Sequence, residues 1–140
     1  MTFSEGELVA MRQRAAELRA EAGGNGSEKK LREAKLCEET IAALDGLDRD
    51  IAELLHRVVA DEAPHLDAKT WYGFPSYARD GKVVVFFQPA SKHETRYATI
   101  GFNEEALLDE GEFWPTAYAV VALSDKFEAK LRGLVHKAAG

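Results

Sequence analysis

The chain has 140 residues, of which 46% are hydrophobic and 30% are charged, a balance that supports one folded domain and argues against global disorder. The net charge of −6 argues against nonspecific nucleic-acid binding, because neutralising phosphates requires clustered lysine and arginine. No apolar run approaches the roughly 18 residues of a membrane span, and the first residues lack an apolar signal core. Together with a single cysteine, Cys37, these features predict a cytoplasmic protein without a disulfide.

The first residues predict a helix followed by a linker. Ser4 and Glu7 have the spacing of a capping box, and apolar residues then recur at helical spacing. The glycine-rich stretch 23–26 should end this helix. We therefore divide the chain into residues 1–26, a helix with its linker, and residues 27–140, a single domain.

Two further helices are predicted before the sequence pattern changes. Ser27 can cap the second helix and Gly46 can end it, while Pro64 marks the end of the third. The short connection between them favours an antiparallel pair. The side chains expected to be buried are Leu31, Ala34, Ile41 and Leu44 in the second helix, and Leu47, Ile51, Leu54, Leu55, Val58 and Val59 in the third.

The remaining sequence predicts strands and a final helix. Asp80-Gly81 is a strong hairpin signal, and the apolar run that follows it is typical of a central strand that Pro89 ends. Residues 96–102 and 116–123 predict two more strands. Asn103 and Ser124 are expected to cap a short helix and a final helix. This order predicts a two-layer α+β fold, in which an antiparallel sheet packs against helices and carries an N-terminal helical extension.

No catalytic signature is present in the sequence. The histidines show no metal-ligand spacing, and His56 and His136 are expected to be solvated on helices. There is neither a nucleophile elbow nor a glycine-rich phosphate loop. Cys37 lies near a buried helix stripe, which suits a structural thiol better than a nucleophile. We therefore predict that the chain is not an enzyme.

An acidic run at residues 103–112 is one candidate site. It contains five carboxylates and no basic residue, and hard cations prefer several oxygen ligands. The same carboxylates could instead stabilise a helix N-terminus and solvate a loop. A second acidic group, Asp61, Glu62 and Asp67, would strengthen a metal site if the two groups met in space. The candidate metal ligands are Glu104, Glu105, Asp109, Glu110 and Glu112.

Aromatic residues form the other candidate site. They gather in rigid segments at 70–77 and 113–115, where rings can wall a pocket. Basic residues on a neighbouring connection would suit that pocket to a small anionic ligand. The alternatives are a hydrophobic minicore that closes one end of the sheet, or an exposed surface for protein–protein contacts. The candidate ligand-binding residues are Trp71, Tyr72, Phe74, Tyr77, Lys92, Arg96 and Trp114.

Four motifs occur in order along the chain: TWYGFPSY at 70–77, DGKVV at 80–84, TRYATIGF at 95–102 and FWPTA at 113–117. They resemble the YdhG-type family, a bacterial domain of unknown function whose members are often labelled frataxin-like intracellular iron chaperones. The similarity spans about residues 47–139, and the helices before it resemble an extension found in some members. The resemblance implies an antiparallel sheet covered by helices, with iron held by scattered surface carboxylates.

The leading expectation is therefore a non-enzymatic, frataxin-like iron chaperone or metal-binding protein. One alternative is a module that binds a small anionic ligand through the aromatic and basic residues. Another is a protein–protein adaptor that uses exposed aromatic rings. Iron is the one metal that the sequence suggests, no nucleic-acid or membrane partner is expected, and the oligomeric state is left open.

Overall fold

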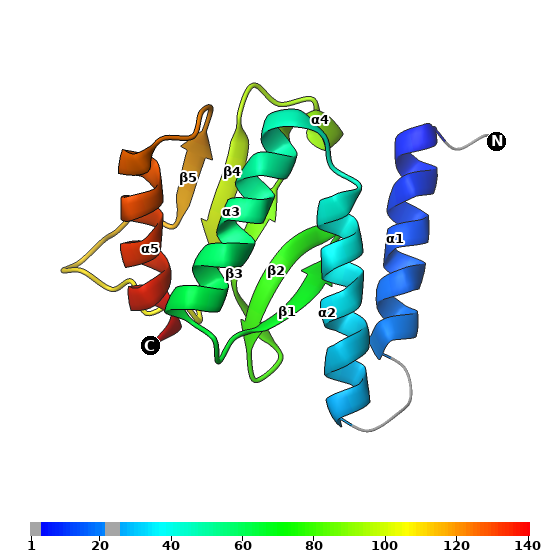
Figure 1. Ribbon diagram of the computed structural model, residues 1–140, viewed down its shortest axis with the longest axis horizontal. Helices are drawn as coiled ribbons and strands as arrows, with labels where there is room; N and C mark the ends of the chain where they lie inside the picture. The colour runs from blue at the N-terminus through cyan, green and yellow to red at the C-terminus, as the bar shows by residue number, and fades with distance from the viewer. Residues whose placement is uncertain (1–3, 22–25) are drawn as a thin grey trace.

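A five-stranded antiparallel sheet with three helices laid across one face forms the body of the protein (Figure 1). The computed structural model describes residues 4–21 and 26–140, and the side chains of residues 4–17 and 26–140. The predicted α+β class, with helices ahead of the sheet, is confirmed. In chain order the elements are α1 (Glu5–Glu21), α2 (Gly26–Ala42), α3 (Gly46–Glu62), β1 (Asp67–Trp71), β2 (Phe74–Arg79), β3 (Lys82–Gln88), α4 (Ala90–His93), β4 (Ala98–Phe102), β5 (Ala117–Val120) and α5 (Asp125–Ala139).

The strands are neighbours in space in the same order as in sequence, β1-β2-β3-β4-β5. Two-residue turns join the first three strands, and both residues of each turn have positive φ: 53° and 78° at Tyr72-Gly73, and 52° and 80° at Asp80-Gly81. Such turns match the right-handed twist of paired strands. The Asp80-Gly81 hairpin is thus confirmed. The turn at Tyr72-Gly73 and the strand before it were not predicted.

Pro75 lies inside β2, where a proline would ordinarily argue against a strand. Trp71 pairs with Phe74 next to the turn, and Thr70 pairs with Pro75. Hydrogen-bonded and non-hydrogen-bonded pairs alternate in an antiparallel ladder, so the pair after the one that closes the turn is non-hydrogen-bonded. The backbone nitrogen of Pro75, which carries no hydrogen, therefore faces away from β1. Pairing of β2 with β3 begins only at Ser76, so no ladder hydrogen bond is lost.

Helices α2, α3 and α5 cover one face of the sheet, and α1 packs on the outer side of α2 (Figure 1). Phe87 and Ile100, two strand residues on the covered face, are at most 1% exposed and join Ile51 and Leu55 of α3 in one core. The opposite face is covered by none of these three helices. In the described part of the chain, no helix has both the length and the apolar composition that a membrane crossing requires.

The N-terminal helices agree with the prediction at the cap of α1 and differ from it at the start of α2. Ser4 caps α1 as predicted, since its hydroxyl accepts a hydrogen bond of 3.1 Å from the N–H of Glu7. The expected linker residues 23–25 lie outside the described residues, and α2 begins at Gly26, one residue before the predicted Ser27 cap. The carboxylate of Glu17, which is 3% exposed, accepts a hydrogen bond of 3.0 Å from the N–H of Gly73 and so joins α1 to the sheet.

The buried face of α3 lies close to the predicted stripe, although Leu47 at the start of α3 is 42% exposed. The prediction for α2 is wrong at Leu31, which is 71% exposed. That residue lies towards the N-terminal end of α2, which projects beyond the sheet (Figure 1). The prediction is confirmed at Ile41, which is buried together with Cys37 further along α2, where the helix meets β1 and β2.

The segment between β4 and β5, residues 103–116, is an irregular loop, so the predicted short helix after Asn103 is wrong. A single turn is closed by the N–H of Ala106, which donates to the carbonyl of Asn103 at 3.0 Å. The next N–H, that of Leu107, donates at 3.0 Å to the carbonyl of Ala138 in α5. Tertiary contacts with α5 therefore replace the helical bonds that local sequence favours. The predicted Ser124 cap of α5 is confirmed by a bond of 3.1 Å from the N–H of Phe127.

Candidate functional site

Trp71, Phe74 and Phe86 form a cluster of rings on the sheet face that α2, α3 and α5 leave uncovered; we call it the Trp71 cluster. The ring centroid of Phe86 lies 5.2 Å from that of Trp71 and 6.0 Å from that of Phe74. His93 meets Phe74 edge-on at 5.3 Å, and Tyr72, which is 70% exposed, packs against Trp71. The three cluster rings are half-buried against one another. This arrangement matches the predicted minicore more closely than a pocket wall.

Tyr77 lies on the opposite, helix-covered face and is 1% exposed. Its hydroxyl is 2.9 Å from Nδ1 of His56, which is half-buried rather than solvated as predicted. Burial raises the pKa of Tyr77 well above its usual range, and it raises the pKa of the neighbouring Cys37 thiol to about 11. Both groups are therefore neutral at pH 7, and Tyr77 is part of the core and not of a ligand site.

The two predicted cations lie at the end of the sheet near α4. Lys92 is in α4 and Arg96 is in the connection to β4, and both residues are exposed. Partial desolvation of its ammonium group lowers the pKa of Lys92. The guanidinium carbon of Arg96 lies 5.4 Å from the centre of the Tyr97 ring. Neither cation lines any of the cavities described below.

Trp114 lies near β5, at the opposite edge of the sheet from Trp71, so the structure does not bring the two tryptophans together. A groove of about 310 Å³ runs between α5 and the chain segment around Trp114; we call it the Trp114 groove. Trp114 and Tyr118 supply aromatic walls, and Leu134 of α5 is a further apolar lining residue. The ammonium nitrogen of Lys130 lies 5.4 Å from the centre of the Tyr118 ring, a distance typical of cation–π attraction.

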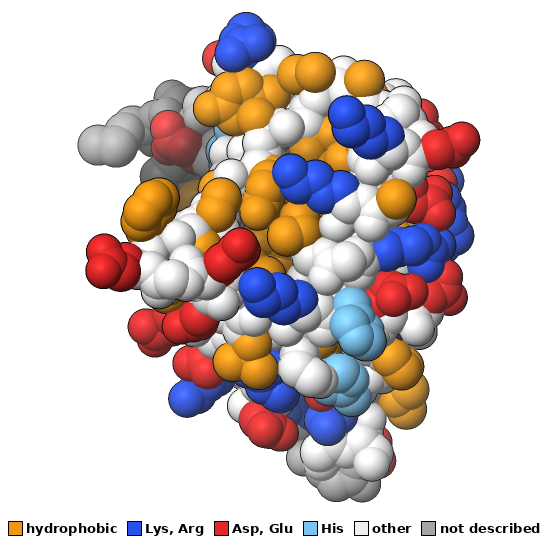
Figure 2. Space-filling view, turned by 90° about the vertical axis from the view of Figure 1, so that its left-hand side faces the viewer, with side chains coloured by type: hydrophobic (Ala, Val, Ile, Leu, Met, Phe, Trp, Pro, Cys, Tyr) orange, Lys and Arg blue, Asp and Glu red, His pale blue; other side chains and the backbone are white. Residues whose placement is uncertain are grey.

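Two more cavities adjoin the Trp114 groove. One, of about 160 Å³, is lined by Tyr118, Lys130 and apolar residues of β4 and α5. The other, of about 480 Å³, shares Trp114 with the groove and is also lined by Glu104 and Asp109. Figure 2 shows this side of the molecule, where hydrophobic side chains gather in the middle with basic side chains among them. An aromatic and aliphatic surface with cations at its rim suits a ligand that has both an apolar body and a negative charge.

Two of the five predicted metal ligands, Glu104 and Asp109, line the same cavity, together with Asn103 and Thr116. These residues offer oxygen atoms, the ligand type that hard cations prefer. However, no three or more histidine, cysteine, aspartate or glutamate side chains come together as a metal-binding group among residues 4–17 and 26–140. The structure therefore brings together part of the predicted metal site.

The other three predicted metal ligands lie apart. A carboxylate oxygen of Glu105 is 3.7 Å from Nζ of Lys82, and one of Glu110 is 3.8 Å from Nζ of Lys137. Glu112 is exposed. Exposed ion pairs of this kind are weak, so the pair of Glu110 with Lys137 adds little to the stability of the fold.

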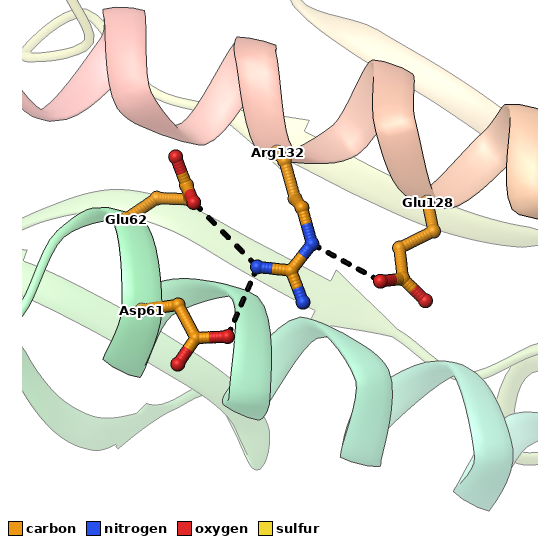
Figure 3. Close-up of polar contacts among 4 residues, drawn as sticks. All are labelled: Asp61, Glu62, Glu128 and Arg132. Carbon is orange, nitrogen blue, oxygen red and sulfur yellow. Dashed lines mark hydrogen bonds and ion pairs between the residues drawn. The ribbon is translucent and has the colours of Figure 1, made fainter.

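The second acidic group does not join the first. Asp61 and Glu62 at the end of α3 pair with Arg132 of α5, with N···O distances of 3.0 and 3.5 Å (Figure 3). The hydrogen bond to Asp61 is the main reason why the pKa of Arg132 is raised. Asp67 pairs with Lys30 of α2 at 3.3 Å. These carboxylates are matched to basic side chains and help to hold the helices in place.

Several residues of the groove were not among the predicted site residues. Tyr118, Lys130 and Leu134 each line both the groove and the smaller cavity. Lys130 and Leu134 are four residues apart in α5, a spacing that puts both on one helix face. That spacing is visible in the sequence, but the contact of this face with β5 depends on tertiary packing.

No family model matches the chain, and neither does any curated protein or solved structure. The resemblance to the YdhG-type family therefore stays a prediction.

Proposed function

We propose that the protein is a non-enzymatic binding module that takes a small ligand with an apolar body and an anionic group in the Trp114 groove. The observation that supports this most directly is the arrangement of Trp114, Tyr118 and Lys130, which combines two aromatic walls with a cation beside one of them. Stacking and apolar burial would hold the body of the ligand, and the ammonium group would hold its charge.

The charges along the groove favour an anion over a cation. Lys130 and Lys137 line it, against a single carboxylate, that of Glu110. Glu110 has 81% of its side chain exposed and lies 3.8 Å from Lys137, so little free energy is lost when an incoming anion takes its place.

The probe for this proposal is 8-anilino-1-naphthalenesulfonate, an aromatic anion that fluoresces in apolar sites. We expect saturable binding with about one site per chain. Lys130→Gln should weaken it by about three- to tenfold, because a charge-assisted contact contributes on the order of 1 kcal/mol. Lys35→Gln, at an exposed position of α2, is the matched control and should have no effect. The uncharged analogue N-phenyl-1-naphthylamine should not distinguish Lys130→Gln from the wild type.

Energy transfer from tryptophan to the probe identifies which aromatic site is used. The chain has two tryptophans, so Trp71→Phe leaves Trp114 as the donor and Trp114→Phe leaves Trp71. We expect strong quenching on binding in the Trp71→Phe protein and weaker quenching in the other. Quenching that is stronger in the Trp114→Phe protein would move the site to the Trp71 cluster and contradict the proposal.

Iron binding is the second candidate function. It is supported by the predicted resemblance and by the two carboxylates, Glu104 and Asp109, that line one cavity. Anaerobic calorimetric titration with Fe(II) tests it, and the Glu104→Gln, Asp109→Asn double variant should lose saturable binding if these carboxylates are ligands. Glu112→Gln is the control, since Glu112 is exposed and does not line that cavity. Absence of saturable binding by the unaltered protein would remove this candidate.

A further inference from the structure

Strand β5 is one edge of the sheet, and its outward backbone groups can be identified from the register. The N–H of Phe102 donates to the carbonyl of Thr116 at 2.7 Å, and Ala98 is opposite Val120. Thr116 is therefore in a hydrogen-bonded pair, and such pairs recur at every second residue of an antiparallel ladder. The residues of β5 that alternate with them, Ala117 and Ala119, turn their N–H and C=O groups away from β4. Among the described residues, hydrogen bonds reach the backbone of β5 only from β4.

This edge lacks the features that usually prevent a strand from pairing with another chain. The segment 113–124, FWPTAYAVVALS, contains no charged residue, and its one proline precedes the strand. Ala117, Ala119 and Val121 are exposed, the last of them by 63%. Natural edge strands are commonly protected by charged side chains, prolines or bulges. By contrast, β1 at the other edge includes Asp67 and Lys69.

Positive charge lies beside this uncharged edge. Lys126 and Lys130 are exposed in the first half of α5, and Lys130 and Ala119 line the same cavity. Among the ion pairs of the described residues, none includes Lys126 or Lys130. The nearby acid Glu128 bonds to Arg132 at 3.0 Å, while Asp125 lies in the first turn of α5. In a chain of net charge −6, two available lysines next to a free strand edge indicate an acidic partner.

A second copy of the chain is a poorer match. Antiparallel pairing of β5 with itself about a two-fold axis would place the α5 helix of each copy close to its counterpart. The β5 segment of a second copy, residues 113–124, contains no charged residue, so it offers Lys126 and Lys130 no acidic side chain to pair with.

We propose that an acidic peptide segment of a partner protein binds in an extended conformation along β5 and adds a sixth strand to the sheet. Its backbone pairs with the outward groups of Ala117 and Ala119, as in other cases of strand addition. Alternate side chains point towards the two faces of the sheet. Acidic side chains on the helix side reach Lys126 and Lys130, and apolar side chains on the other side pack beside Ala119. The site adjoins the Trp114 groove but depends on backbone pairing, which binding of a small anion does not require.

The test uses a synthetic peptide of about seven residues that alternates glutamate and valine, with fluorescence anisotropy as the readout. Ala119→Pro removes the outward N–H and should weaken binding by about tenfold or more, whereas Ala119→Val keeps it and should bind as the wild type does. Lys126→Gln with Lys130→Gln should weaken binding by about tenfold, and a peptide with lysine in place of glutamate should not bind. Unchanged binding in the Ala119→Pro protein would overturn the proposal.

A second measurement keeps the test independent of how well the proline variant folds. Peptides that are N-methylated at alternate residues on one edge cannot pair with β5 from that edge. Of the two possible methylation patterns, we expect one to abolish binding and the other to preserve it. Equal binding of both would show that no strand is added and would overturn the proposal.

The probe from the groove experiment separates the two proposals. The Ala119→Pro protein should still bind 8-anilino-1-naphthalenesulfonate while losing the peptide, and Trp114→Ala, which removes a wall of the groove, should lose the probe while keeping the peptide. Unchanged probe binding in Trp114→Ala with the peptide retained would reject the groove alone. Sedimentation velocity addresses self-pairing. A wild-type dimer that becomes a monomer in Ala119→Pro, with no peptide binding, would identify a second copy as the occupant of β5 and overturn the proposal.

Discussion

The guanidinium group of Arg79 donates a hydrogen bond of 2.7 Å to the carbonyl oxygen of Ala139, in the last turn of α5. A second bond of 2.6 Å runs from the same group to the carbonyl of Glu105 in the 103–116 loop. Because a helix C-terminus carries partial negative charge, the cation is favoured there. One side chain of β2 therefore connects α5 to the loop, and these are the two elements between which the Trp114 groove lies.

Replacing Arg79 should loosen both elements. Arg79→Met should lower the free energy of unfolding by about 2–3 kcal/mol, since two main-chain acceptors lose a charged donor. Amide hydrogen exchange should also become faster in the 103–116 loop. Arg96→Met is the control, because Arg96 is exposed, and it should change the free energy of unfolding by less than about 0.5 kcal/mol. If exchange in the loop is unaltered in Arg79→Met, the guanidinium is not what holds the loop.

Asp48 joins α3 to α4 and should make stability depend on acidity. Its carboxylate accepts hydrogen bonds of 2.6 Å from the Ser91 hydroxyl, and of 3.0 and 3.1 Å from the N–H groups of Ala90 and Ser91. Burial alone would raise the pKa of Asp48, but these three bonds outweigh it and lower the pKa below the ordinary value of 3.8. The stabilisation is therefore complete above about pH 4 and is lost as the pH falls through the folded-state pKa.

Urea unfolding at pH 7 and at pH 3 measures this contribution. Asp48→Asn should cost about 1–3 kcal/mol at pH 7, because an amide accepts these three bonds less well than a carboxylate does. The variant should also lose less stability than the wild type between the two pH values. Asp50→Asn, at an exposed position of the same helix, serves as the control. An unchanged pH dependence in Asp48→Asn would mean that other carboxylates dominate acid unfolding.

Residue type and spacing along the chain were enough to predict the Asp80-Gly81 turn, the Ser124 cap and the apolar stripe of α3. The positive φ values at Asp80-Gly81 and the bond to the Ser124 hydroxyl follow from residue type and spacing. The apolar stripe of α3 is regular, and most of it is buried. By contrast, β1 was missed because its residues, DAKTW, alternate weakly and because the proline that follows suggested a loop.

The candidate sites depended on which face and which edge each residue occupies. Phe74 and Tyr77 are three residues apart in one strand, so strand alternation places them on opposite faces; this signal was available in the sequence and was not used. Trp71 and Trp114 were grouped because both lie in proline-containing aromatic segments. They belong to opposite edges of the sheet, and nothing in their local sequences specifies the edge.

The thiol of Cys37 should be inaccessible to reagents, and its ionisation should make the free energy of unfolding depend on pH in the alkaline range. The residue is 0% exposed, and burial raises the pKa of the thiol from 9.0 to about 11. Because the folded-state pKa is the higher one, this contribution to stability is complete below about pH 9 and is lost as the pH rises towards 11. Tyr77, whose pKa burial also raises, should act in the same direction.

Thiol labelling with 5,5′-dithiobis(2-nitrobenzoate) at pH 8 checks the first part. We expect the native protein to react about 100-fold or more slowly than the protein in denaturing urea, because reaction requires local opening. For the second part, Cys37→Ala should lose about 1 kcal/mol at pH 7 through the small cavity it leaves, and its stability should fall less between pH 9 and 11 than that of the wild type. Rapid labelling of the native protein would contradict the buried position.

Position 101 should accept only glycine, because Phe86 of the Trp71 cluster lies against it. It pairs with Phe86 across β3 and β4, and the Phe86 ring lies over it so closely that a β-carbon at position 101 would collide with the ring. Gly101→Ala should therefore cost about 1–3 kcal/mol, as overpacking typically does. Because the ring centroid of Phe86 is 5.2 Å from that of Trp71, the displaced ring should also change the fluorescence of Trp71.

A double-mutant cycle distinguishes this collision from a general intolerance of alanine in β4. In a Phe86→Leu background the ring is absent, so Gly101→Ala should cost at least about 1 kcal/mol less than it does in the wild type. Gly133→Ala in α5 is the control, since a β-carbon there meets nothing within 4 Å, and it should stabilise the helix by about 0.5–1 kcal/mol. If Gly101→Ala costs the same in both backgrounds, contact with Phe86 is not what requires glycine at this position.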